Sequence, residues 1–155
     1  MSEKARRASS REEEADHLLA LYKGDAGRVM STIESQLQSL ASRAQTLLSL
    51  TGITITVTGF SGASIAKSSA MAAILIVGGL VLVLFGAALC IGGILAVQWT
   101  TALAPCELRA AVLYALARRD EKTRAYSRAL VLVALGLSAY VASVSLLLLE
   151  ALHGR

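Results

Sequence analysis

Residues 70–97 read AMAAILIVGGLVLVLFGAALCIGGILAV, without a single charged side chain. A helix of about 20 apolar residues crosses the hydrocarbon core of a bilayer, and this run has about 28. A second uncharged run, residues 129–149, is also long enough to cross. The sequence therefore predicts an all-α fold, that of a helical integral membrane protein.

The charged residues are confined to two blocks. They make up 17% of the chain, whereas apolar residues make up 55%, and soluble domains carry about 25% charged residues. Residues 1–46 hold seven basic and seven acidic side chains, and residues 99–128 hold six basic and three acidic ones. Because aromatic residues are not interleaved with the basic ones, we expect no nucleic-acid polymer as a partner.

Residues 47–66 decide how many times the chain crosses the bilayer. Ile53, Ile55 and Val57 alternate with threonines, which is typical of a strand. If this segment instead crosses as a helix, both charged blocks lie on the same side, with thirteen of the fifteen Lys and Arg residues. The positive-inside rule favours that arrangement.

We therefore predict three transmembrane helices in a bacterial inner membrane, at 47–66, 70–98 and 129–149. Residues 1–46 form a cytoplasmic helical segment with an amphipathic helix, divided near Gly24 and Asp25. Residues 99–128 form a basic cytoplasmic helix that ends in a charged turn, RRDEKTR (118–124). Residues 150–155 form a short external C-terminus.

Two patterns predict helix packing. The first is a heptad-like apolar stripe, which leaves a face in need of a partner and favours a homo-oligomer. It consists of Met30, Ile33, Leu37, Leu40, Ala44 and Leu47. The second is a stripe of small residues seven apart, Ala72, Gly79, Gly86 and Gly93, which lets two helices approach closely. Its partner is either another helix of one three-helix monomer or a neighbouring subunit.

Polar residues suggest two candidate sites. Thr51, Thr54, Thr58 and Ser61 continue the heptad stripe into the first span; they either line a polar path or bond their own backbone. Six basic residues are candidates for contact with anionic lipid headgroups or with a soluble anion such as a nucleotide. They are Arg109, Arg118, Arg119, Lys122, Arg124 and Arg128. The acidic cluster of Glu12, Glu13, Glu14 and Asp16 favours a helix N-terminus.

The residues of a catalytic site are absent from the predicted spans. Their interiors contain no His, Asp or Lys and no paired carboxylates. Cys90 and Cys106 have neither the spacing nor the neighbours of a metal site. We therefore expect no enzyme activity, no metal and no cofactor.

Two stretches carry a resemblance to a known group. LASRAQTLLSLTGI (40–53), at the start of the first span, and ARRDEKTRAYSRAL (117–130), before the last, resemble the layout of the Pycsar-type transmembrane effectors of bacterial antiphage systems. That resemblance implies activation by a cyclic nucleotide and loss of membrane integrity. Only Arg43 and Ala44 match that group's pattern at the start of the first span, and no nucleotide-contacting residue can be transferred.

Two functions are therefore expected as alternatives. The first is an oligomeric effector or channel-like protein that changes membrane permeability through helix rearrangement, with antiphage defence as the implied setting. The second is a non-catalytic structural subunit of a larger membrane complex. The expected partners are the lipid bilayer, further copies of the chain, and a cytoplasmic protein or cyclic-nucleotide ligand.

Overall fold

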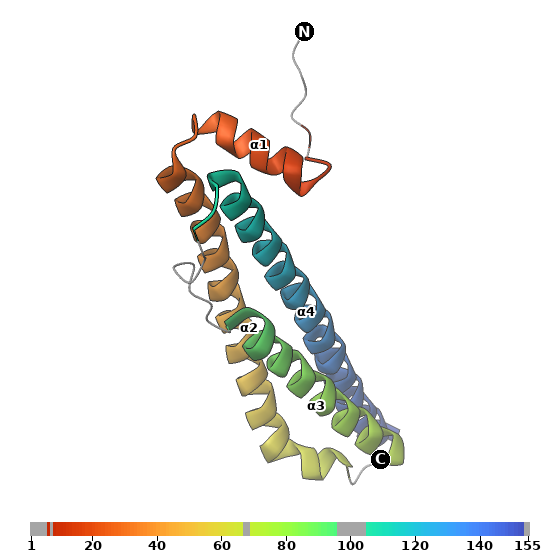
Figure 1. Ribbon diagram of the computed structural model, residues 1–155. Helices are drawn as coiled ribbons and strands as arrows, with labels where there is room; N and C mark the ends of the chain where they lie inside the picture. The colour runs from red at the N-terminus through yellow and green to blue at the C-terminus, as the bar shows by residue number, and fades with distance from the viewer. Residues whose placement is uncertain (1–5, 7, 67–68, 96–104, 154–155) are drawn as a thin grey trace. The chain divides into compact units, whose positions relative to one another are not determined.

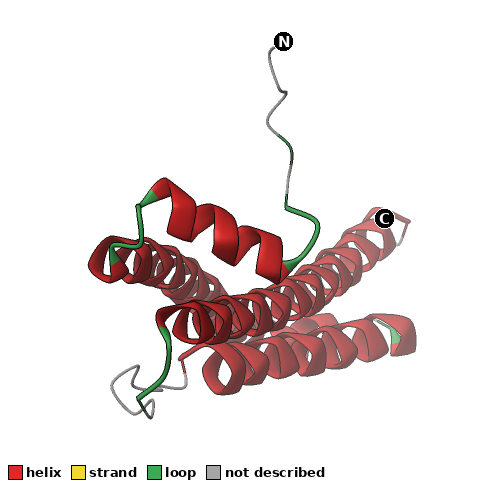
Figure 2. Ribbon diagram, turned by 45° about the horizontal axis from the view of Figure 1, so that its top comes forward, coloured by secondary structure: helices red, strands yellow, loops and turns green. Residues whose placement is uncertain are grey.

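The computed structural model describes residues 6, 8–66, 69–95 and 105–153, and only the backbone for residues 61–66. Within these ranges the elements are α1 (Arg11–Leu21), α2 (Ala26–Ala66), α3 (Ala70–Cys90), the π-helix η1 (Ile91–Leu95) and α4 (Leu108–His153) (Figure 1). The described ranges contain no strand (Figure 2), so the all-α prediction is confirmed.

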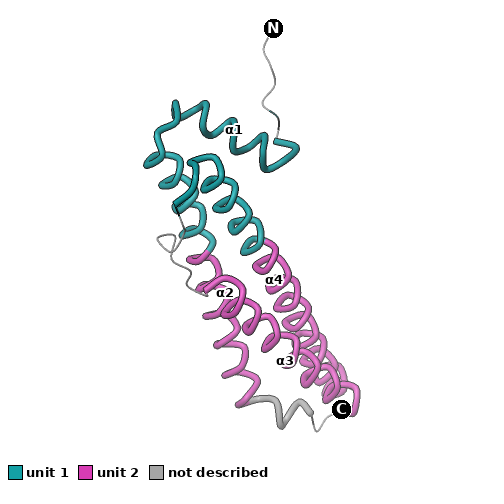
Figure 3. Tube along the Cα trace, in the orientation of Figure 1, with its two compact units in different colours: residues 1–40, 97–123 teal, residues 41–96, 124–155 magenta. Residues whose placement is uncertain are grey.

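Several sequence predictions fall outside the described residues. They concern the turn between the first two predicted spans, which contains Lys67, the side chain of Ser61, the end of the second span at residues 96–98, and the last two residues of the C-terminal segment. The chain divides into two compact units (Figure 3). Unit 1 comprises residues 1–40 and 97–123, and unit 2 comprises residues 41–96 and 124–155.

A short break separates α1 from α2, as predicted. The Ser10 hydroxyl caps α1 by accepting a hydrogen bond from the backbone N–H of Glu13 at 3.1 Å. After α1 the chain turns through Lys23 and Gly24, whose φ angles are 51° and 74°. This left-handed conformation ends a helix and favours glycine. The Asp25 carboxylate then accepts a hydrogen bond from the first turn of α2 at 3.1 Å.

Helix α3 begins where the sequence predicts. The hydroxyl of Ser69 accepts a hydrogen bond from the backbone N–H of Ala72 at 3.2 Å. The buried positions of α3 recur every three or four residues, at Ala72, Ile76, Gly79, Val83, Gly86 and Cys90. A π-helix has a wider turn that shifts the register by one residue. After η1 begins, the buried position is therefore Ile94, while Gly93 is partly exposed.

Helix α4 is continuous, so the charged turn predicted for residues 118–124 is wrong. The sequence has no Gly or Pro between Pro105 and Gly136, and Arg, Lys and Glu are good helix formers. Arg118 also donates a hydrogen bond to Glu121 across one helical turn at 3.1 Å. A high density of charge indicated solvent exposure here, but it did not interrupt the helix.

The core of unit 1 forms where α1 lies across the starts of α2 and α4 (Figure 1). It contains Ala15, Val29, Ile33, Val112, Ala115 and Leu116. Met30 and Leu37 pack against this core, and Leu40 is partly exposed. The expectation that the heptad stripe leaves an unpartnered face is therefore wrong for Met30, Ile33 and Leu37. The same chain supplies the partner.

In unit 2 the small-residue stripe of α3 packs against α4. A Cβ atom on Gly79 would lie 2.8 Å from the carbonyl oxygen of Gly136, and one on Gly86 would lie 2.6 Å from Cγ2 of Val133. By contrast, a Cβ on Gly78 would meet no atom within 4 Å. Of the two partners left open by the sequence, the stripe contacts a helix of its own chain.

Both ends of this packing carry further contacts. A Cβ on Gly93 would lie 2.7 Å from the Cβ of Ala125. At the other end, the buried hydroxyl of Ser143 donates a hydrogen bond to the carbonyl oxygen of Ala72 at 2.8 Å. The second contact satisfies a polar group that would otherwise be buried without a partner.

Two helical stretches are long and apolar enough to cross a membrane, Ala70–Leu95 and Leu108–Leu152. Only 28% and 17% of their most apolar windows are buried within the chain. A core helix of a soluble protein buries most of such a window. These two helices therefore expose an unusually large apolar surface. Over its described residues, α2 is not among these stretches, although residues 47–66 are helical throughout.

Candidate functional site

The basic start of α4 contacts α1, the helix that carries the acidic cluster. Arg109 donates two hydrogen bonds to Asp16, from Nε to Oδ1 at 2.7 Å and from Nη2 to Oδ2 at 3.0 Å. Arg119 donates from both terminal nitrogens to Glu14, with Nη2 to Oε2 at 2.9 Å, and also to Asp120 at 2.8 Å. These are the two-pronged contacts that a guanidinium makes with a carboxylate.

The two pairs differ in their exposure to water. The side chains of Arg119 and Glu14 are 20% and 29% exposed, whereas those of Arg109 and Asp16 are 48% and 58% exposed. Water and salt therefore screen the Arg109–Asp16 pair more strongly. The hydrogen bonds from Arg109 still hold the pKa of Asp16 below its ordinary value. Hydrogen bonding to Glu14 raises the pKa of Arg119 further above its already high ordinary value.

The six basic candidates are therefore not all available to a ligand. Arg109, Arg118 and Arg119 pair with carboxylates of the same chain. Lys122 and Arg124 also interact with neighbouring groups, and Arg128 is exposed. The acidic cluster does more than favour a helix N-terminus, because two of its members hold α1 on α4.

An open pocket of about 430 Å³ lies beside the first turn of α1. It is lined by Ala8, Ser9, Ser10, Arg11, Glu12, Glu14 and Asp120. Three carboxylates against one guanidinium repel an anion, so this pocket does not suit the cyclic nucleotide that the resemblance implies. The Glu13 carboxylate accepts hydrogen bonds from the backbone and hydroxyl of Ser9 nearby, and these hold its pKa below the ordinary value.

The threonine face of α2 lies in unit 2 and is buried. Thr51, Thr54 and Thr58 are 3%, 8% and 9% exposed. The hydroxyl of Thr51 donates to the carbonyl oxygen of Leu48 at 2.7 Å, and that of Thr54 donates to Leu50 at 2.9 Å. These two hydroxyls therefore bond their own helix, the arrangement that lets threonine enter an apolar environment.

The described side chains form no cluster of three or more His, Cys, Asp or Glu residues that could hold a metal ion. Cys90 is buried and Cys106 is exposed, and both are free thiols.

Comparison of the chain with protein-family models, curated proteins and solved structures found no match.

Proposed function

We propose that this chain is a three-span protein of the bacterial inner membrane that changes membrane permeability when its helices rearrange. It acts as an oligomeric effector or channel-like assembly and performs no bond chemistry. Antiphage defence is the setting that the resemblance suggests. The observation that carries the membrane part of this proposal is the polarity of α2 between Leu50 and Phe60.

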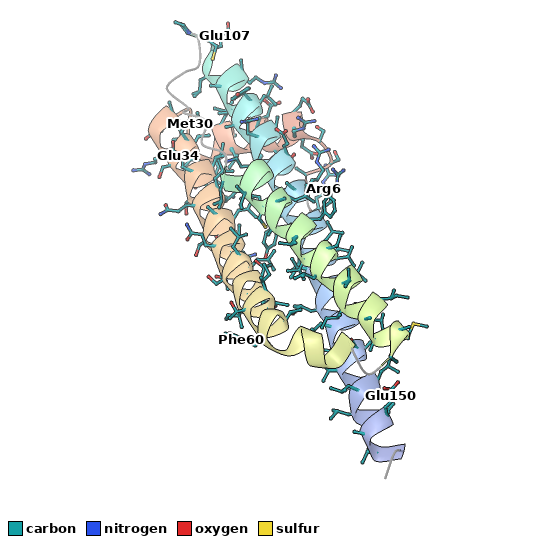
Figure 4. All side chains as sticks on the ribbon, turned by 90° about the horizontal axis from the view of Figure 1, so that it is seen from below. Arg6, Met30, Glu34, Phe60, Glu107 and Glu150 are labelled. Atoms are coloured by element: carbon teal, nitrogen blue, oxygen red, sulfur yellow. The ribbon has the colours of Figure 1, made fainter. Side chains whose placement is uncertain are left out.

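In this part of α2 the large apolar side chains are exposed, whereas three of the four threonines, Thr51, Thr54 and Thr58, are buried. Ile53 and Phe60 are 62% and 86% exposed, and Figure 4 shows Phe60 at the outside of α2. Thr54, by contrast, is only 8% exposed. Water would penalise this arrangement, whereas lipid solvates the apolar face and leaves the polar groups inside the bundle. The outer faces of α3 and α4 support the same environment, with Phe85 and Leu135 exposed.

The three-span topology predicts that Lys67 and Arg124 lie on opposite sides of the membrane. Single-cysteine variants Lys67→Cys and Arg124→Cys, made after replacing Cys90 and Cys106 with serine, test this prediction in intact spheroplasts. We expect an impermeant maleimide to label position 67 before lysis and position 124 only afterwards. Labelling of both positions before lysis, or of neither, contradicts a membrane span at 47–66.

The buried hydroxyl face of α2 supports a role in permeability. Thr54→Leu with Thr58→Leu removes two hydroxyls from this face and adds bulk to it. Because two leucines replace hydroxyls of the proposed polar path with apolar bulk, we expect release of a trapped dye from proteoliposomes to slow by about tenfold, a rise of about 1.4 kcal/mol in the barrier. Thr56→Leu is the matched control, because Thr56 bonds its own backbone in the same way but is exposed. Unchanged release in the double variant removes support for this mechanism.

Assembly with further copies is supported by the outer face of α2. A Cβ atom on Gly52 or on Gly59 would meet no atom within 4 Å, so a second backbone can approach there. Particle mass in mild detergent distinguishes this proposal from a structural subunit. A homo-oligomer supports the effector, whereas stable co-purification with unrelated subunits supports the alternative.

A further inference from the structure

Helix α1 is held in place by few buried contacts and by ion pairs. It spans only Arg11–Leu21, and Ala15 is its one buried residue. Isolated helices shorter than about 12 residues are marginal in water, so α1 is helical chiefly while it is docked. Its polar attachment to α4 includes the pairs of Glu14 with Arg119 and of Asp16 with Arg109.

Arg109 and Arg119 lie at the two ends of one short face near the start of α4. Arg109, Val112, Leu116 and Arg119 follow one another at spacings of three and four, and we call them the Arg109–Arg119 face. The two middle residues are fully buried in the core that α1 helps to cover. If α1 leaves, Arg109 loses its carboxylate and Arg119 keeps only the carboxylate of its neighbour Asp120. Both guanidiniums then flank the side of the apolar strip that α1 covered.

This combination has the chemistry of a lipid-binding surface. A guanidinium binds a phosphate with the same two-pronged geometry that it uses for a carboxylate. The apolar strip suits the boundary between headgroups and acyl chains. A negatively charged bilayer would also repel α1, whose first six residues include Glu12, Glu13, Glu14 and Asp16.

We propose that α1 is an autoinhibitory cover, and that the Arg109–Arg119 face binds phosphate groups of anionic lipids once α1 is displaced. This proposal rests on the membrane location proposed above. Glu14 and Asp16 occupy the sites that lipid phosphates take. A lipid ligand fits better than a soluble one because the same helix continues into the predicted span at 129–149.

Amide hydrogen exchange of α1 in the full chain tests the cover. The protein is reconstituted in phosphatidylcholine vesicles, or in phosphatidylcholine mixed with phosphatidylglycerol, and recovered by flotation. In neutral vesicles we expect the α1 amides to be protected, and in anionic vesicles to exchange at least about tenfold faster. Inorganic phosphate at matched ionic strength, added to neutral vesicles, is expected to have no such effect.

A charge-matched pair of double variants makes the test specific. We expect Glu14→Gln with Asp16→Asn to exchange rapidly in both kinds of vesicle. Glu34→Gln with Glu150→Gln removes the same charge from exposed residues outside α1 that form no ion pair with Arg109 or Arg119 within the described contacts, and it is expected to behave as wild type.

Each of the remaining outcomes refutes a specific part of the proposal. The cover is refuted if the α1 amides of the wild type are equally protected in both kinds of vesicle. It is also refuted if the α1 amides of the Glu14 and Asp16 double variant are as protected in neutral vesicles as those of the wild type. If inorganic phosphate releases α1, the Arg109–Arg119 face binds a soluble anion instead of a lipid. Failure of the protein to float with vesicles refutes the proposed membrane function itself.

Discussion

Replacing Gly136 with leucine is expected to force α3 and α4 apart and to lower the free energy of unfolding by about 3 kcal/mol or more. A Cβ atom at this position would lie 2.6 Å from the carbonyl oxygen of Gly79. It would also lie 2.7 Å from Cγ2 and 3.1 Å from the backbone nitrogen of Val83. Two of these three atoms belong to the backbone of α3, so a side-chain rotation cannot remove the overlap.

Gly78→Leu is the matched control for this substitution. Gly78 is exposed on the same helix as Gly79, and a Cβ there would meet no atom within 4 Å. Because leucine also favours a helix over glycine by up to about 1 kcal/mol, this variant is expected to be neutral or slightly stabilised. Thermal unfolding of the detergent-solubilised protein, followed by circular dichroism, measures both. Equal midpoints for the two variants would contradict the packing of α3 on α4.

Sequence spacing predicted the small-residue contact but not its partner. Glycines seven apart on an apolar helix indicate a close approach of some other backbone, and Gly79 and Gly86 make such an approach. The partner positions on α4, Gly136 and Val133, give no comparable repeat in the sequence. The register shift at Ile94 was also not predictable, because nothing in IGGIL distinguishes a π-helix from an α-helix.

The ion pairs between α1 and α4 illustrate a second limit. Asp16 and Arg109 are 93 residues apart, and Glu14 and Arg119 are 105 residues apart. A local pattern of acidic residues followed by apolar ones predicts a helix start, and Ser10 and Glu13 confirm one. Which distant cation each carboxylate meets depends on tertiary packing, and one sequence alone carries no signal for it.

The apolar stripe shows how a correct pattern missed a partner within the same chain. The stripe predicted a face that must be buried, and Ile33 is buried. The pattern within residues 1–46 did not show that another segment of the same chain covers this face. The start of α4 packs against this face because α4 begins at Leu108, well before the predicted third span.

Leu116→Ala is expected to destabilise unit 1 by about 2–5 kcal/mol, because Leu116 is fully buried and its truncation leaves a cavity. The loss should appear first in α1, which depends on this core for its apolar contacts. We expect amide exchange in residues 11–21 to rise by at least about thirtyfold, in line with the lower end of that range. Exchange in α3, which lies in unit 2, is expected to change far less.

Leu21→Ala removes the same atoms from an exposed position and provides the control. Leu21 is 60% exposed at the end of α1, so its truncation should cost no more than about 0.5 kcal/mol. A comparison of the two variants separates the loss of buried contacts from the general effect of replacing leucine in a helix. If Leu116→Ala leaves the exchange of α1 equal to that of Leu21→Ala, then α1 does not depend on the core of unit 1. In that case its ion pairs alone hold it on α4, and the Glu14 and Asp16 substitutions should release it completely.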